Sequence, residues 1–172
     1  MGIVYKNKWL NIKKKNNYYF VDENLDQVAV IPYVNKSFIL VKQFRPTLNK
    51  NTIEFPAGSF NKNIESPKKA AIRELFEETG IKIKNLHRLK KIKKISINPQ
   101  RNTKLPYIFF IKIYKKELLR IRSKSNEEII AALIIKTNNL LGLIKKGAMM
   151  SSFMNSILFS FLLIKKKITI KY

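Results

Sequence analysis

The segment from Ser66 to Gly80 constrains the fold more than any other part of the sequence. Ser66 is typical of a helix N-cap, Pro67 suits the first helical position, and Gly80 stands where a C-terminal cap is expected. The body between them carries an apolar stripe, formed by Ile72, Leu75 and Phe76. The sequence therefore predicts an amphipathic helix over residues 68–79, with one face packed against another element.

The same helix carries three glutamates on one side. Glu74 and Glu78 are four residues apart, hence one turn apart, and Glu77 lies beside them. Such carboxylates repel one another, and the helix dipole disfavours the two near the C-terminus. Hard divalent cations such as Mg²⁺ or Mn²⁺ take oxygen ligands and would stabilise this arrangement. The alternative is a solvated acidic face, an unexpected feature in a chain with 35 basic and only 11 acidic residues.

Strand patterns lie on both sides of this helix. Apolar runs predict strands at residues 3–10, 27–34, 37–44, 89–97, 106–114 and 128–135, with a polar connection at 13–17. A short helix capped by Thr137 or Asn138 and a last helix over residues 151–164 follow. Strands before and after a central helix indicate a single mixed α/β (α+β) domain over residues 1–172, with a strand region at 1–26 and a C-terminal helix within 148–172.

Composition excludes several kinds of site. The chain has no Cys, which excludes disulfides and thiolate zinc sites, and its single His, His87, rules out a multi-His metal site. The net charge of +24 suits binding to nucleic acid or to an anionic membrane. However, 29 of the basic residues are Lys and only 6 are Arg, and the Lys residues are spread along the chain, which favours compositional drift. A nucleic-acid partner is therefore allowed but not favoured.

The two ends of the chain bear on its location. Residues 1–11 contain no apolar stretch like that of a secretory signal, so we expect a cytoplasmic protein. Residues 147–164 contain no charged residue, which is close to the minimum for a membrane span, but several Ser residues and an Asn interrupt the stretch. We expect a buried or dimer-packing helix there rather than a membrane anchor.

The helix and the residues before it resemble the Nudix box. That motif runs Gly, five residues, Glu, seven residues, Arg-Glu, an aliphatic residue, any residue, Glu-Glu, any residue, Gly and an aliphatic residue. From Glu65 through residues 73–81 the chain fits at every fixed position, but six residues rather than five separate Gly58 from Glu65. The extra residue lies in a loop, so it affects the expected placement of Glu65 and leaves the helix in register.

The flanks resemble the ADP-sugar diphosphatase (ADP-ribose pyrophosphatase) branch of that family, at residues 8–10, 28–32, 40–46, 53–58 and 126–129. The resemblance implies the Nudix fold, a mixed β-sheet sandwiched between helices. It also implies Mg²⁺ or Mn²⁺ as cofactor, a nucleotide diphosphate sugar as substrate and assembly as a homodimer. The metal ligands that it implies are Glu74, Glu77, Glu78 and the backbone carbonyl of Ala57, and the structural residues are Gly58, Glu65, Arg73 and Gly80.

On the substrate side, the resemblance implies that Arg45 holds a phosphate or the terminal ribose and that Glu54 hydrogen-bonds the substrate. Trp9 corresponds to an aromatic residue that stacks on adenine, partly across a dimer; an edge-strand anchor is an equally good interpretation. The catalytic base is Glu77, Glu127 or Glu128, and the sequence leaves the choice open.

Two segments depart from the family pattern. Relatives usually have Pro-Gly in the loop after the helix, whereas this chain has Asn98-Pro99-Gln100. Arg101, in the same loop, is then either an added phosphate contact or a solvated residue. The segment between Trp9 and the strand at 27–34 is short, so a second stacking aromatic residue is either missing or replaced by one of three residues: Tyr18, Tyr19 or Phe20.

The reaction implied is hydrolysis of a phosphoanhydride, with ADP-ribose giving AMP and ribose 5-phosphate. Cations and a positioned carboxylate supply what such a reaction needs, namely charge stabilisation and a proton acceptor for the attacking water. Alternatives are another nucleotide sugar, an RNA 5′ end, or a non-catalytic nucleotide-binding protein of the same family. The three intact helix glutamates argue against the non-catalytic alternative.

Overall fold

A seven-stranded mixed sheet forms the centre of the protein. The computed structural model describes residues 1–118, 129–149 and 151–165. The strand order is β10-β5-β4-β9-β8, with β6 paired to β5 and β7 paired to β4; β4 and β9 run parallel and the other pairs antiparallel. The bounds are β4 (Asp26–Val34), β5 (Ser37–Arg45), β6 (Lys50–Glu54), β7 (Ala57–Phe60), β8 (Lys90–Ile92), β9 (Tyr107–Lys112) and β10 (Ile129–Lys136).

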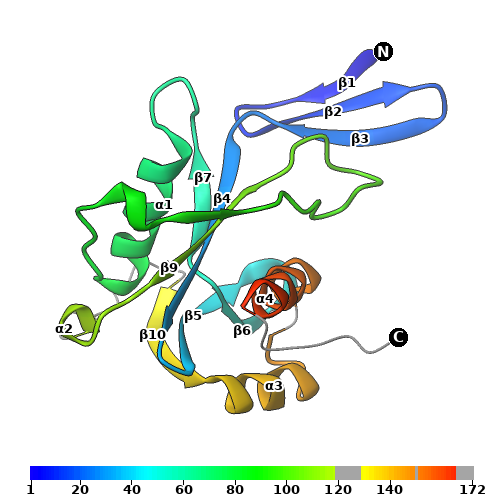
Figure 1. Ribbon diagram of the computed structural model, residues 1–172. Helices are drawn as coiled ribbons and strands as arrows, with labels where there is room; N and C mark the ends of the chain where they lie inside the picture. The colour runs from blue at the N-terminus through cyan, green and yellow to red at the C-terminus, as the bar shows by residue number, and fades with distance from the viewer. Residues whose placement is uncertain (119–128, 150, 166–172) are drawn as a thin grey trace.

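Helices cover both faces of this sheet, as the sequence predicted (Figure 1). Alternation along β4 sends Val28 and Val30 to the face packed by α1 (Pro67–Thr79), whereas Ala29 and Ile31 point to the face packed by α4 (Ser152–Ile164). All four side chains are almost fully buried, with at most 1% exposure. The continuous apolar run in this segment therefore reflects a strand covered on both sides.

The helix ends follow their capping residues. Ser66 and Gly80 cap α1 as predicted, and Ser151 caps α4. The prediction for α3 (Thr137–Lys145) was wrong in its cap, because Lys136 precedes the helix and the Thr137 hydroxyl donates to the Lys36 carbonyl instead. The structure also contains the short helix α2 (Lys115–Leu118) and two 3-10 turns, η1 (Pro46–Leu48) and η2 (Leu86–Arg88).

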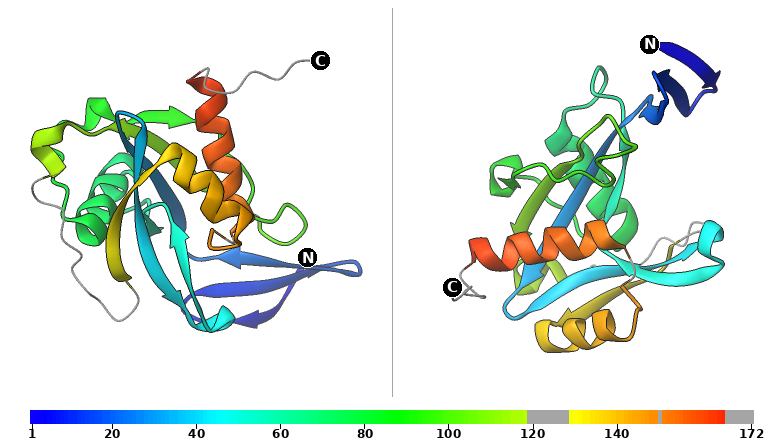
Figure 2. Two further views of the ribbon diagram at one scale, coloured as in Figure 1. Left: turned by 90° about the horizontal axis from the view of Figure 1, so that it is seen from below. Right: turned by 90° about the vertical axis from the view of Figure 1, so that its right-hand side faces the viewer.

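A separate three-stranded sheet lies at the N-terminus and extends to one side of the central sheet (Figures 1 and 2). It consists of β1 (Gly2–Lys6), β2 (Leu10–Lys15) and β3 (Tyr18–Glu23). The single strand predicted over residues 3–10 was wrong. The side chain of Asn7 accepts hydrogen bonds from the backbone N–H groups of Trp9 and Leu10 at 2.8 and 2.9 Å, which makes a turn there. Residues 13–15, predicted as a connection, belong to β2.

The strand predicted over residues 89–97 shortens to β8. The last residue of β8, Ile92, pairs with Ile108, which is the second residue of β9. Because the two strands are antiparallel, residues after Ile92 run past the start of β9 and find no strand to pair with in the described part of the chain. Within the described ranges, no helix is long and apolar enough to cross a membrane, and six residues of α4 are buried in the protein.

Candidate functional site

Helix α1 places two glutamates in the interior. Its N-terminus is fixed by the Ser66 hydroxyl, which accepts from the backbone N–H of Lys69, and Gly80 ends it with a φ of 74°. Leu75 is fully buried on the face toward β4 and β7. Glu74 and Glu78 flank that apolar stripe, and each is only 8% exposed. The packing of α1 thus forces two carboxylates out of water.

Strand β7 approaches these carboxylates closely. A Cβ atom built on Gly58 would lie 2.3 Å from the carboxyl carbon of Glu74, so only glycine leaves room for that group. The backbone N–H of the neighbouring Ala57 donates to Oε2 of Glu78 at 3.2 Å. The strand therefore holds both carboxylates against its backbone.

Arg73 ties the remaining acids together. Its guanidinium donates to Glu74 at 2.7 Å, to Glu77 at 3.0 Å and to Glu65 at 3.0 Å, and it also reaches the carbonyl of Ser59 at 3.3 Å. Burial alone would lower the pKa of Arg73, but these hydrogen bonds raise the pKa above its ordinary value. The backbone N–H groups of Ile64 and Glu65 donate to the Asn61 carbonyl and form a turn. Glu65 therefore contacts Arg73 despite the extra residue before it.

Burial raises the pKa of both Glu74 and Glu78. Burial raises the pKa of Glu78 to about 8, and the nearby charge of Glu74 adds to the effect against a smaller opposing contribution from the Ala57 N–H. Burial also raises the pKa of Glu74, although Arg73 opposes it. Glu78 therefore lacks a positive charge close enough to stabilise its ionised form, and at Glu74 the charge of Arg73 does not fully offset burial.

A second polar network lies beside this pair. Arg45, at the end of β5, makes a bidentate ion pair with Glu54 of β6 at 2.8 and 2.6 Å, and the Thr52 hydroxyl donates to Glu54 at 2.5 Å. Burial would raise the pKa of Glu54, but these donors outweigh it and lower the pKa. The charges of Arg45 and Glu54 also influence the pKa of Glu78, so the network lies within electrostatic reach of the α1 acids.

Sequence reasoning missed Thr52. Thr52 and Glu54 alternate along β6 and share a buried face, at 2% and 5% exposure. The alternation of Thr52 and Glu54 was the signal that could have predicted a buried polar pair. The pair becomes part of a charged network because the neighbouring strand β5 carries Arg45.

The fit to a divalent cation is partial. Among the described residues, no three Asp, Glu, His or Cys side chains are gathered so that they could hold a metal ion. Glu77 has a side chain that is 51% exposed and turns to Arg73, whereas Glu78 turns to the Ala57 N–H. The available donors are nevertheless carboxylate oxygens, including those of the buried side chains of Glu74 and Glu78, and Mg²⁺ and Mn²⁺ prefer oxygen ligands.

Other predicted residues lie elsewhere. Trp9 is 60% exposed in the turn between β1 and β2, with Lys8 over its ring at 4.8 Å. Arg101 donates to the Tyr19 carbonyl at 2.9 Å, and so holds its loop against β3. Glu127 and Glu128 lie outside the described residues.

Comparison with known proteins identifies relatives of this chain. Two curated relatives are similar over part of their length: an ADP-sugar pyrophosphatase of Mus musculus, 49% identical over 65 residues, and an ADP-ribose pyrophosphatase of Bacillus subtilis, 43% identical over 63 residues. These alignments cover 35% and 36% of the chain and 29% and 34% of the relatives, so the chain spans about a third of the curated proteins it matches.

The fold has a close counterpart among solved structures. The crystal structure of an ADP compounds hydrolase superimposes with a TM-score of 0.71 at 19% identity, over 97% of this chain and 94% of that one. The NUDIX domain family model matches residues 24–146, which include the central sheet strands, α1 and the four glutamates around it: Glu65, Glu74, Glu77 and Glu78. Motif, fold and family model agree, and the chain belongs to the Nudix family.

Proposed function

We propose that this protein is a pyrophosphohydrolase that cleaves the diphosphate linkage of a nucleotide sugar with Mg²⁺ or Mn²⁺ as cofactor. ADP-ribose, giving AMP and ribose 5-phosphate, is the first candidate substrate, and the names of the relatives support the choice of an ADP compound. The observation that carries the proposal is the pair of buried carboxylates, Glu74 and Glu78, packed against the backbone at Gly58.

The chain's own groups divide into ligands and orienting residues. Glu74, Glu77, Glu78 and the Ala57 carbonyl would hold the cation, and Arg73 links Glu74 and Glu77 to Glu65. When bound, the cation supplies charge neutralisation at the diphosphate and acidifies the attacking water. The base that accepts the water proton is Glu77, Glu127 or Glu128.

Arg45 and Glu54 are the proposed substrate contacts beside the acids. The Arg45 side chain is 38% exposed, and its planar guanidinium group suits a phosphate. The ion pair with the buried Glu54 holds the guanidinium in place. A phosphate that draws Arg45 away would leave the buried Glu54 with Thr52 as a remaining hydrogen-bond donor.

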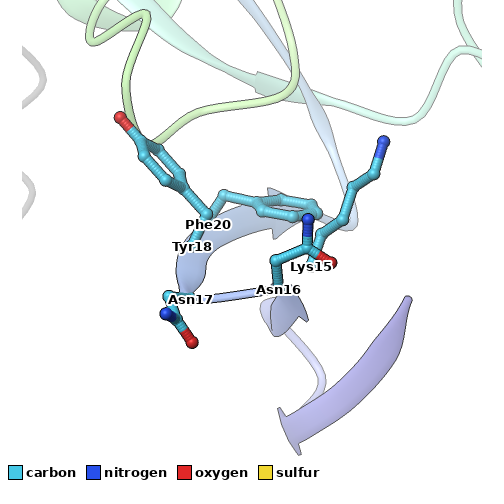
Figure 3. Close-up of a pocket in the computed structure, with 5 residues that line it drawn as sticks. All are labelled: Lys15, Asn16, Asn17, Tyr18 and Phe20. Atoms are coloured by element: carbon cyan, nitrogen blue, oxygen red, sulfur yellow. The ribbon is translucent and has the colours of Figure 1, made fainter.

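Base stacking is proposed for the N-terminal sheet. A hollow of about 480 Å³ at the β2–β3 turn is lined by Lys15, Asn16, Asn17, Tyr18 and Phe20 (Figure 3). Tyr18 and Phe20 share one face of β3, because residues alternate along a strand. This sheet extends away from α1 within one chain (Figure 1), so Trp9 and these rings would serve a second copy's acids in a homodimer.

Hydrolysis of a panel of nucleotide diphosphate sugars with Mg²⁺, read out by product identity, tests the proposal. We expect ADP-ribose to yield AMP, with loss of turnover in EDTA. Glu78→Gln should lose most Mg²⁺-dependent turnover while remaining folded. Glu117→Gln, which removes an acid bonded to Arg88 away from the cluster, should keep its turnover.

The alternatives separate in the same assay. Near-normal turnover by Glu78→Gln would refute the metal assignment, and binding of nucleotides without hydrolysis would leave a non-catalytic family member. Faster hydrolysis of a 5′-modified RNA than of every nucleotide sugar would identify RNA 5′ ends as the substrate class instead. Light scattering tests the homodimer, and cell fractionation tests the predicted cytoplasmic location.

A further inference from the structure

The N-terminal sheet needs contacts beyond its covalent link to hold a fixed direction. We call this sheet, residues 2–23, the arm, and it extends to one side of the central sheet (Figure 2). β3 ends at Glu23 and β4 begins at Asp26, so only Asn24 and Leu25 link the two sheets. Within the described residues, no strand of the arm pairs with a strand of the central sheet. Each linking residue has two rotatable backbone bonds, so the link alone does not fix the arm.

A loop from the central sheet runs along the open edge of the arm. Residues 93–106 connect β8 to β9, and Asn102 in this loop forms a parallel bridge with Val21 of β3. The Val21 N–H donates to the Arg101 carbonyl at 2.6 Å, and the Thr103 N–H donates to the Val21 carbonyl at 3.2 Å. An edge strand exposes unpaired backbone groups, and the loop pairs with those of β3. The loop therefore extends the arm by one short, strand-like segment.

Side chains of the same loop bind neighbouring positions on the arm. The hydrogen bonds run from Arg101 to the Tyr19 carbonyl at 2.9 Å, from Asn102 to Glu23 at 3.2 Å and from Thr103 to Asp22 at 2.7 Å. Lys104 continues the series, because its ammonium group donates to the carbonyls of Asn24 and Leu25 at 3.3 and 3.4 Å. The loop thus holds both β3 and the two-residue link.

The other part of the loop is fixed to the central sheet. Ile95 and Ile97 pack against the core cluster on the α4 face. A turn joins the two parts, because the Asn98 carbonyl accepts from the backbone N–H groups of Arg101 and Asn102 at 3.1 and 2.9 Å. Apolar contacts therefore anchor one part of the loop in the core, while hydrogen bonds anchor the other part on the arm.

We propose that residues 101–104, the clasp, are positioning residues that fix the arm in the direction needed for substrate binding. The inference rests on the proposed function in one respect, because the arm carries Trp9, Tyr18 and Phe20, the rings proposed to stack on the base. Arg101 lies beside these rings, with its guanidinium carbon 5.9 Å from the centroid of the Tyr18 ring. Rings that are already in place spare the substrate the cost of ordering them.

Trp9 gives a direct readout of the arm. It is the only Trp in the chain, and it lies in the turn between β1 and β2. Its time-resolved fluorescence anisotropy therefore separates nanosecond motion of the arm from tumbling of the whole protein. Steady-state hydrolysis of ADP-ribose with Mg²⁺ supplies KM and kcat for the same samples.

Two matched triple variants provide the test. The clasp variant, Arg101→Met/Asn102→Ala/Thr103→Val, removes the three side-chain hydrogen bonds to the arm. The control variant, Lys136→Met/Thr137→Val/Asn138→Ala, removes one positive charge, one hydroxyl and one amide at the start of α3 instead. Thermal melting checks that each variant is folded.

In the clasp variant we expect the amplitude of fast Trp9 motion to rise at least about twofold, because the arm then turns on its link. KM for ADP-ribose should rise at least about fivefold, because the substrate must then order the arm as it binds. The acids are unaltered, so kcat should change less than about twofold. The control variant should match the unaltered protein in all three quantities.

Unchanged Trp9 motion in the clasp variant, or an equal change in the control variant, would overturn the inference. A raised KM without faster Trp9 motion would also overturn it, because Arg101 would then contact the substrate directly. Faster motion with an unchanged KM would show that substrate binding does not need a fixed arm. If the unaltered protein hydrolyses no substrate, the proposed function fails, whereas the Trp9 measurement still decides whether the clasp fixes the arm.

Discussion

Replacing Glu78 by Gln should stabilise the metal-free protein at high pH while abolishing its activity. Glu78 is 8% exposed, and its pKa of about 8 lies above the ordinary value of 4.5. Between pH 4.5 and about 8, the Glu78 carboxyl is therefore protonated in the folded state and ionised in the unfolded state. Where the folded state binds more protons, stability falls as pH rises. Gln resembles the protonated carboxyl and avoids that loss.

The magnitude follows from the pKa difference. Each pKa unit corresponds to about 1.4 kcal/mol, so the rise from 4.5 to about 8 sets a ceiling of about 5 kcal/mol above pH 8. Relaxation and water entry reduce such penalties, and we expect a gain of about 3 kcal/mol in the Gln variant. For a chain of 172 residues that corresponds to roughly 6–12 °C in melting temperature.

Denaturant unfolding in EDTA at pH 5 and pH 8.5 measures the effect. The difference between variant and unaltered protein should be small at pH 5 and large at pH 8.5, and Mg²⁺ should stabilise only the unaltered protein. Glu117→Gln is the matched control, because hydrogen bonds from Arg88 lower the pKa of Glu117 despite its partial burial. Its loss of stability should grow as pH rises from acid to neutral. A pH-independent difference for Glu78→Gln would refute the reasoning.

Three further substitutions test the surrounding structure. Gly58→Ala should displace the Glu74 carboxylate, which lies 2.3 Å from the new Cβ; we expect turnover to fall more than tenfold while the unfolding free energy drops by no more than about 1–3 kcal/mol. Steady-state kinetics beside urea unfolding checks both. Arg45→Met removes the partner of the buried Glu54 and should cost about 2 kcal/mol at pH 7. The pKa of Glu54 is lowered by folding, so the cost should shrink toward pH 4, and unfolding curves at the two pH values reveal it. Ser66→Ala removes the α1 cap and should cost about 1 kcal/mol, seen as a melting temperature lower by roughly 2–4 °C.

The sequence by itself determined helix α1 and the chemistry on it. Caps and apolar periodicity act over a few residues, so Ser66 and Gly80 fix the helix ends wherever the helix packs. The four-residue spacing of Glu74 and Glu78 likewise fixes their shared face. The runs that became β4 and β5 were predictable because both are continuous and apolar, with Asn35 in the left-handed conformation at their turn.

Only the tertiary structure determined which contacts those acids make and how far they are buried. Arg73 meets Glu74 and Glu77 within α1, but it meets Glu65 only because a turn folds the preceding loop back toward the helix. The raised pKa of Glu78 depends on burial against β7, a strand distant in sequence. The N-terminal sheet depends on both kinds of contact. Its β1–β2 turn is a local feature of the Asn7 side chain, whereas β3 is held by the loop that carries Arg101, which is distant in sequence.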